Sequence, residues 1–95
     1  MPAYVIADLD VHDAAAYEDY RTRVRPVVER FGGRFLVRGG RSETLEGDWK
    51  PRRLVVVEFP SMDRAMQFYR SPEYRPLLEL RLRAARSTVV VVEGA

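Results

Sequence analysis

The sequence predicts one small α+β domain whose strands and helices follow the order β-α-β-β-α-β. The chain has 95 residues, which is the size of a single domain, so residues 1–95 are expected to form one unit. Short valine-rich runs read as strands, and longer segments with apolar residues at helical spacing read as helices. Glycine and proline separate these segments and predict where each element ends.

The first half of the chain predicts a strand followed by a long helix. Residues 3–9 (AYVIADL) read as the strand. Residues 14–31 predict the helix, with apolar side chains at Tyr17, Tyr20, Val24, Val27, Val28 and Phe31. Pro26 lies inside this pattern and lacks a backbone N–H, which predicts a kink. Gly32-Gly33 ends the helix, because glycine accepts the left-handed conformation of helix ends.

The second half predicts two more strands, two short helices and a final strand. The elements are expected at 34–38 (strand), 41–52 (loop), 53–59 (strand), 62–69 (helix), 72–85 (helix) and 87–93 (strand). Ser61 and Ser71 precede the two helices as N-caps, because a serine hydroxyl accepts a bond from a free N–H of the first turn. Pro72 suits the first position of a helix.

This element order is the ferredoxin-like pattern, a four-stranded antiparallel sheet with helices on one face. A sheet with one face in water alternates apolar and polar residues. Residues 54–57 (LVVV) and 89–92 (VVVV) are instead apolar at every position. The helices can cover one face only, and a bare apolar face of this size is unusual in a monomer. An identical sheet is the simplest cover, so we expect a homodimer through the sheet faces.

Composition excludes several classes of protein. There is no Cys and only one His, which excludes disulfides, Cys-based metal sites and a His-rich metal site within one chain. The longest apolar runs are about five residues, against the ~20 that a membrane helix needs. The start, Met1-Pro2-Ala3, lacks the basic region of a signal peptide. We therefore expect a cytoplasmic protein without membrane contact.

The formal net charge is +2, and fifteen of the sixteen basic residues are Arg. Arginine forms two-pronged bonds to carboxylate or phosphate, so an anionic ligand is one interpretation, and solvated helix faces are the other. The glycine-rich loops of nucleotide-binding folds are missing. The aromatic strand motif of RNA-binding modules is missing too, and a charge of +2 attracts phosphate weakly, so we expect no nucleic-acid partner.

Three charged residues interrupt apolar strands: Asp8, Arg38 and Glu58. A charge in such a strand is costly unless it is paired or in contact with water. These side chains therefore either face a pocket, or lie at strand ends where they reach solvent or pair with each other.

Aromatic residues form the second group of candidates. The only Trp, Trp49, lies in a polar loop, where it would cap the core, close over a ligand or pack on a partner subunit. The residues Tyr17, Tyr20, Phe68, Tyr69 and Tyr74 either pack in the core or direct Tyr hydroxyls into a helix–sheet cleft, where Arg81 would add a positive charge. His12, in the turn before the first helix, is either solvated or a general base.

Motifs along nearly the whole chain resemble one known family. They are residues 32–40 (GGRFLVRGG), Glu46-Gly47, Trp49, Pro51, Arg53, residues 58–61 (EFPS), Ala65, Tyr69, residues 71–74 (SPEY), Leu78 and Arg81. This pattern resembles the family called domain of unknown function 1330, within the dimeric α+β barrel superfamily. The resemblance implies two ferredoxin-like protomers whose sheets meet in a barrel. Relatives in that superfamily include cofactor-independent monooxygenases, isomerases and stress-responsive proteins.

The resemblance implies a cofactor-independent oxygenase or isomerase acting on a small carboxylated or aromatic compound. The alternative is a non-catalytic dimeric ligand-binding or stress-response module. The expected ligand-binding residues are Arg38, Glu46, Trp49, Arg53, Tyr69, Tyr74 and Arg81. The catalytic candidates are Arg38, Glu58, Tyr74 and His12. In this scheme an Arg polarises the substrate while a Tyr or Glu moves a proton, and we expect no metal and no cofactor.

Overall fold

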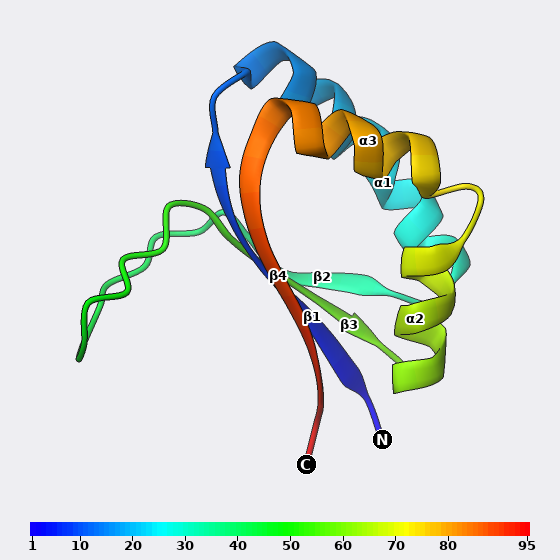
Figure 1. The fold of residues 1–95 in the computed structure, drawn as a ribbon. Coiled ribbons are helices and arrows are strands. Elements are labelled where there is room, and N and C mark those ends of the chain that lie inside the picture. The colour runs from blue at the N-terminus through cyan, green and yellow to red at the C-terminus, as the bar shows by residue number, and fades with distance from the viewer.

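The computed structural model describes residues 1–95 and confirms the predicted α+β fold (Figure 1). The elements are β1 (Ala3–Val11), α1 (Ala14–Arg30), β2 (Arg34–Arg38), β3 (Leu54–Phe59), α2 (Met62–Arg70), α3 (Arg75–Ala84) and β4 (Ala85–Glu93). The first and last strands of the chain, β1 and β4, are each two residues longer than the sequence predicts. None of the helices combines the length and apolar character that crossing a membrane requires.

The four strands form one antiparallel sheet in the order β2-β3-β1-β4, and the helices lie on one face of it (Figure 1). We call this the covered face and the opposite one the open face. Successive side chains of a strand point to opposite faces, and paired residues share a face. Glu58 pairs with Tyr4 and Arg34, and these three lie on the open face. A register shift within β2 then places Arg38 opposite Val55, on the covered face.

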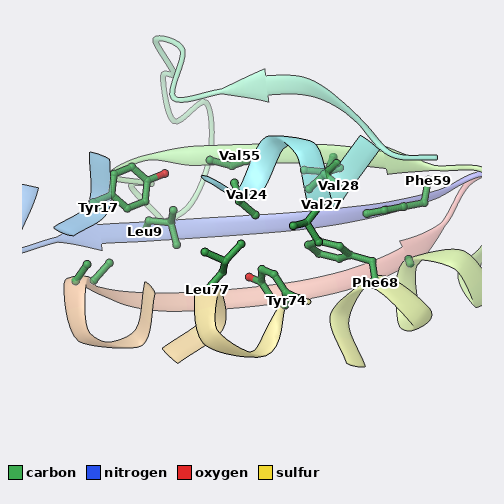
Figure 2. Packing of buried hydrophobic residues seen from close by; sticks show 14 of the residues in the cluster. Leu9, Tyr17, Val24, Val27, Val28, Val55, Phe59, Phe68, Tyr74 and Leu77 are labelled. Atoms are coloured by element: carbon green, nitrogen blue, oxygen red, sulfur yellow. The ribbon is translucent and has the colours of Figure 1, made fainter. Parts of the chain in front are cut away.

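The hydrophobic core fills the space between the covered face and the helices (Figure 2). Phe59 and Val28 are its largest fully buried side chains. The Phe68 ring from α2 lies between Phe59 and Tyr74, with ring centroids 5.2 and 4.4 Å away. Burial of these rings fixes α2 and the turn before α3 against the sheet, since each large aromatic ring removes much apolar area from water.

Local interactions explain where the helices begin and end. The Asp13 carboxylate accepts a bond from the Ala16 N–H and caps α1, which continues through Pro26. Ser61 caps α2 as predicted, by accepting from the Arg64 N–H. The helix predicted from residue 72 begins only at Arg75, because residues 72–74 form a turn.

The loop 39–53 projects beyond the sheet, on the side away from the helices (Figure 1). The Asp8 carboxylate, on the open face, accepts bonds from the Trp49 indole N–H (2.9 Å) and from the Arg52 backbone N–H (3.0 Å). The bond from Trp49, more than any other contact, lowers the pKa of Asp8, so this carboxylate is charged at neutral pH. The charge that interrupts β1 therefore anchors the loop.

Substituting Gly33 with alanine is expected to lower the free energy of unfolding by about 1–3 kcal/mol. A Cβ atom at this position would lie 2.7 Å from Phe59 Cε1 and from Val28 Cγ1, and both neighbours are buried too tightly to move away. Chemical denaturation of Gly33→Ala would measure the loss. The control is Gly40→Ala, where a Cβ atom meets nothing within 4 Å and stability should change by less than about 0.5 kcal/mol. Equal stability of the two variants would contradict the expectation.

Candidate functional site

A cleft of about 60 Å³ lies between the covered face and the three helices. A water molecule needs roughly 10–15 Å³ of such space, so the cleft holds more than one. Apolar side chains from the sheet and helices form most of its walls. The polar side chains that line it are Tyr17, Tyr20, Arg21, Arg38, Tyr69, Tyr74 and Arg81. None of its lining residues is Asp, Glu or His, and of its three arginines only Arg21 has an acidic partner, Glu18 at 3.4 Å.

Three polar groups form a connected chain inside the cleft. The hydroxyls of Tyr20 and Tyr74 are 2.9 Å apart. The Nε of Arg81 donates to the Tyr74 hydroxyl in a long bond of 3.4 Å. The Nη1 atom of Arg81 is buried and has no hydrogen-bond partner. One guanidinium nitrogen is therefore free to bond to a ligand.

The position of this chain follows from local structure. The Ser71 hydroxyl donates to the Phe68 carbonyl oxygen and accepts from the Tyr74 N–H, which holds the turn between α2 and α3. Tyr74 stands at the N-cap of α3, and Arg81 lies seven residues later. Seven residues are about two helical turns, so both side chains fall on the same face of α3. That face packs toward α1, which supplies Tyr20.

Arg81 is only 4% exposed, although no acidic side chain accompanies it. Burying a charge without a counter-charge is costly. Burial lowers the pKa of the Arg81 guanidinium, and the surrounding Tyr74, Tyr20 and Tyr69 hydroxyls together raise it by more, so the group stays charged. A buried guanidinium that contacts hydroxyl groups and no carboxylate is typical of a site that receives an anion from outside.

Burial raises the pKa of the Tyr20 hydroxyl well above its ordinary value, and the neighbouring Tyr74 raises it further. Tyr20 is therefore protonated at neutral pH. Such a hydroxyl can donate a bond to a negatively charged oxygen but does not act as a base. The Tyr20 hydroxyl and the free Arg81 nitrogen are thus two donors of the kind that can bind an oxyanion.

Two further arginines stand at the edge of the cleft. The Arg38 guanidinium lies 4.1 Å from the centre of the Phe35 ring and donates to the Arg21 carbonyl oxygen. Burial, more than the nearby Arg21, lowers the pKa of Arg38. The Nε of Arg53 donates to the Tyr17 hydroxyl at 3.1 Å and orients it, although Arg53 itself does not line the cavity. Arg38 and Arg53 thus have partners, as does the Nε of Arg81, whereas the Arg81 Nη1 has none.

The structure brings together about half of the predicted site residues. Those that line the cleft are Arg38, Tyr69, Tyr74 and Arg81, with Arg53 at its edge. Those that lie elsewhere are Glu46 and Trp49 in the exposed loop, Glu58 on the open face, where it pairs with Arg34 at 2.8 Å, and His12 in an exposed turn. Tyr20 is missing from the predicted site, although its place three residues after Tyr17, on the apolar face of the helix, was a usable signal.

No cluster of three or more His, Asp or Glu side chains lies close enough together to hold a metal ion.

Comparison with solved structures shows that the fold is shared widely. The chain is similar to the RPA0582 protein of unknown function from Rhodopseudomonas palustris (TM-score 0.78, 24% identity, 99% of this chain and 82% of that one). It is also similar to a dimeric ferredoxin-like protein of unknown function from Jannaschia sp. CCS1 (TM-score 0.73, 13% identity, 99% of this chain and 100% of that one). A third similar structure is a mutant of SnoaB, a cofactor-independent oxygenase from Streptomyces nogalater (TM-score 0.72, 14% identity, 98% of this chain and 92% of that one).

At these identities the similar structures show the fold alone. No curated protein sequence matches the chain significantly. The model of one sequence family matches residues 2–95, which is nearly the entire chain. The chain therefore belongs to the family described as domain of unknown function DUF1330.

Proposed function

We propose that the protein binds a small carboxylated or aromatic compound in the helix–sheet cleft and converts it without a cofactor, as an oxygenase or isomerase. The observation that carries the proposal is Arg81, a buried cation with a free nitrogen in a cleft that contains no acid. An anionic ligand would supply the missing counter-charge. The apolar walls would surround the remainder of a small or aromatic molecule.

The geometry suits reactions that pass through a substrate anion. Arg81 would hold a carboxylate or enolate oxygen, and Tyr74, bonded to both Arg81 and Tyr20, would exchange a proton with the substrate. An isomerase would return this proton to a different carbon atom. An oxygenase would instead let the substrate carbanion pass electrons to dioxygen and form a C–O bond; the resulting peroxide anion would take up a proton and lose water to leave a carbonyl group. The similarity in fold to SnoaB supports the second branch by analogy.

A non-catalytic dimeric ligand-binding or stress-response module is the second candidate. The cleft measures only about 60 Å³, and the Tyr20 and Tyr74 hydroxyls already satisfy each other. Both features suit a site that holds a ligand without changing it. Binding without turnover would favour this candidate.

We also propose that the protein acts in the cytoplasm as a homodimer that buries the open face. That face carries exposed apolar side chains, among them Val90 at 54% and Val37. Similar ferredoxin-like structures from Jannaschia sp. CCS1 and Bacteroides fragilis are described as dimeric, which supports the proposal. A second sheet over the same face would remove these valines from water.

The homodimer predicts that Val90→Lys converts the protein to a monomer at micromolar concentration. A lysine on the open face would place a charge within the buried interface. Light scattering or sedimentation would measure the mass. The control is Gln67→Lys, which adds the same charge at an exposed position of α2, a helix on the covered face, and should leave the dimer intact. A wild-type monomer, or a dimer that survives Val90→Lys, would contradict the proposed interface.

Arg81→Met is expected to abolish ligand binding while changing the free energy of unfolding by less than about 1 kcal/mol. The substitution removes a buried charge that has no acidic partner and loses only the long bond to Tyr74. Chemical denaturation and titration with benzoate would measure the two effects. Arg83→Met, on the exposed side of the same helix, should change neither. A clear loss of stability in Arg81→Met would mean that this guanidinium serves the fold instead.

A thermal-shift screen of small carboxylates and aromatic acids would supply compounds for a direct test of function. Each compound that binds would be followed by oxygen consumption and by deuterium incorporation from heavy water. Tyr74→Phe should lower the rate by about 100-fold or more, because it removes the proton-transferring hydroxyl. Tyr4→Phe is the control, since Tyr4 lies on the open face. Unchanged turnover in Tyr74→Phe would overturn its role, and binding without turnover would favour the non-catalytic module.

A further inference from the structure

A second, mainly apolar cavity adjoins the cleft. This groove of about 200 Å³ lies between α2 and the edge strand β4. Its walls are Ala65, Met66 and Tyr69 from α2 and valines from β1 and β4; the Tyr69 hydroxyl is the one polar side-chain group, and no charged residue lines it. Met66 and Tyr69 belong to a helix on the covered face, and Val90 brings the groove to the edge of the sheet beside the proposed dimer interface.

Tyr69 joins the groove to the inner cleft. It lines both cavities, as do Val5 and Val89. Tyr69 is 37% exposed, and the centroid of its ring lies 5.7 Å from that of the Tyr74 ring. Tyr74 in turn contacts Arg81. The groove therefore adjoins the cleft at Tyr69, and a ligand that displaces the Tyr69 ring could extend from the groove toward the buried guanidinium.

We propose that the ligand is an amphipathic monoanion, with its anionic head at Arg81 and an extended apolar body in the groove between α2 and β4. A medium-chain carboxylate and an arylalkanoate share this chemistry. The inference rests on the proposed binding of an anion in the cleft and adds the second subsite and the resulting substrate class.

The arrangement of charges favours one anionic head group at Arg81. The Arg81 Nη1 has no partner, whereas Arg38 donates to the Arg21 carbonyl oxygen. Arg21, whose buried Nε also has no partner, is neutralised by Glu18 at 3.4 Å. The groove offers no ionic partner for a second charge, since no charged residue lines it. A charged group placed there would lose its water without gaining a counter-charge. The body of the ligand is therefore apolar.

Titration of the full-length wild-type protein with straight-chain carboxylates from acetate to decanoate would test this inference. Each added methylene that enters the groove should tighten binding by about fourfold, until the chain extends beyond the groove and affinity levels off. Octanoate should bind at least tenfold more tightly than octan-1-ol, which lacks the charge. Octanoate should also bind at least tenfold more tightly than octanedioate, because that dianion would place its second carboxylate in the apolar groove.

Two neighbouring substitutions on α2 locate the apolar body. Met66→Glu places a charge in the groove and should weaken octanoate binding at least tenfold, while acetate binding changes by less than about twofold. Gln67→Glu adds the same charge one residue later, at an exposed position that does not line the groove, and should weaken neither.

The outcomes separate this inference from the proposed function. Affinity that depends on Arg81 but not on chain length or Met66→Glu would overturn the amphipathic ligand and leave anion binding in the cleft standing. Octanoate affinity that is unchanged in Arg81→Met would overturn the placement of the head group, and with it both proposals. Affinity that rises with chain length and falls in both Met66→Glu and Arg81→Met would support the inference.

Discussion

The packing of three helices onto a single face of a four-stranded sheet is the constraint on which the remaining features depend. The Phe68 ring lies between Phe59 of β3 and Tyr74 at the start of α3, and so connects the sheet to two helices. This contact sets the position of the turn that carries Tyr74 and the direction of α3. The same one-sided arrangement leaves the valines of the open face without cover, which is the physical basis of the proposed dimer.

The cleft is a consequence of the same packing, at the place where α1 and α3 meet above the sheet. Large aromatic side chains keep the backbones apart there, and polar atoms occupy the space that remains. A core would ordinarily balance a buried guanidinium with a carboxylate. The acidic residues of this chain instead lie on exposed helix surfaces, in the loop or on the open face, where Glu58 pairs with Arg34. The charge imbalance at Arg81 is thus local, and a ligand is the group that would correct it.

Much of the fold could be predicted from local sequence patterns, and about half of the predicted site residues do line the cleft. The runs LVVV and VVVV predict buried strands without ambiguity, and Ser61 predicts the start of α2. The turn at residues 72–74 was harder to predict, because Ser71 bonds both backward to Phe68 and forward to Tyr74. Tyr74 and Arg81 were expected near a ligand, whereas Tyr20 was seen only as part of an aromatic group. Helical spacing shows which residues share a face of one helix, but it does not show which hydroxyl groups on different helices form a hydrogen bond.

The sequence by itself determined the order of the elements and the excess of apolar strand surface, because these follow from composition and periodicity within short segments. Only the tertiary structure decided the roles of the three charges that interrupt the strands. Asp8 anchors a loop, Glu58 forms an ion pair on the open face, and Arg38 lies at the edge of the cleft. The difference depends on which face the helices cover and on a register shift in β2, and both result from contacts between segments distant in the chain.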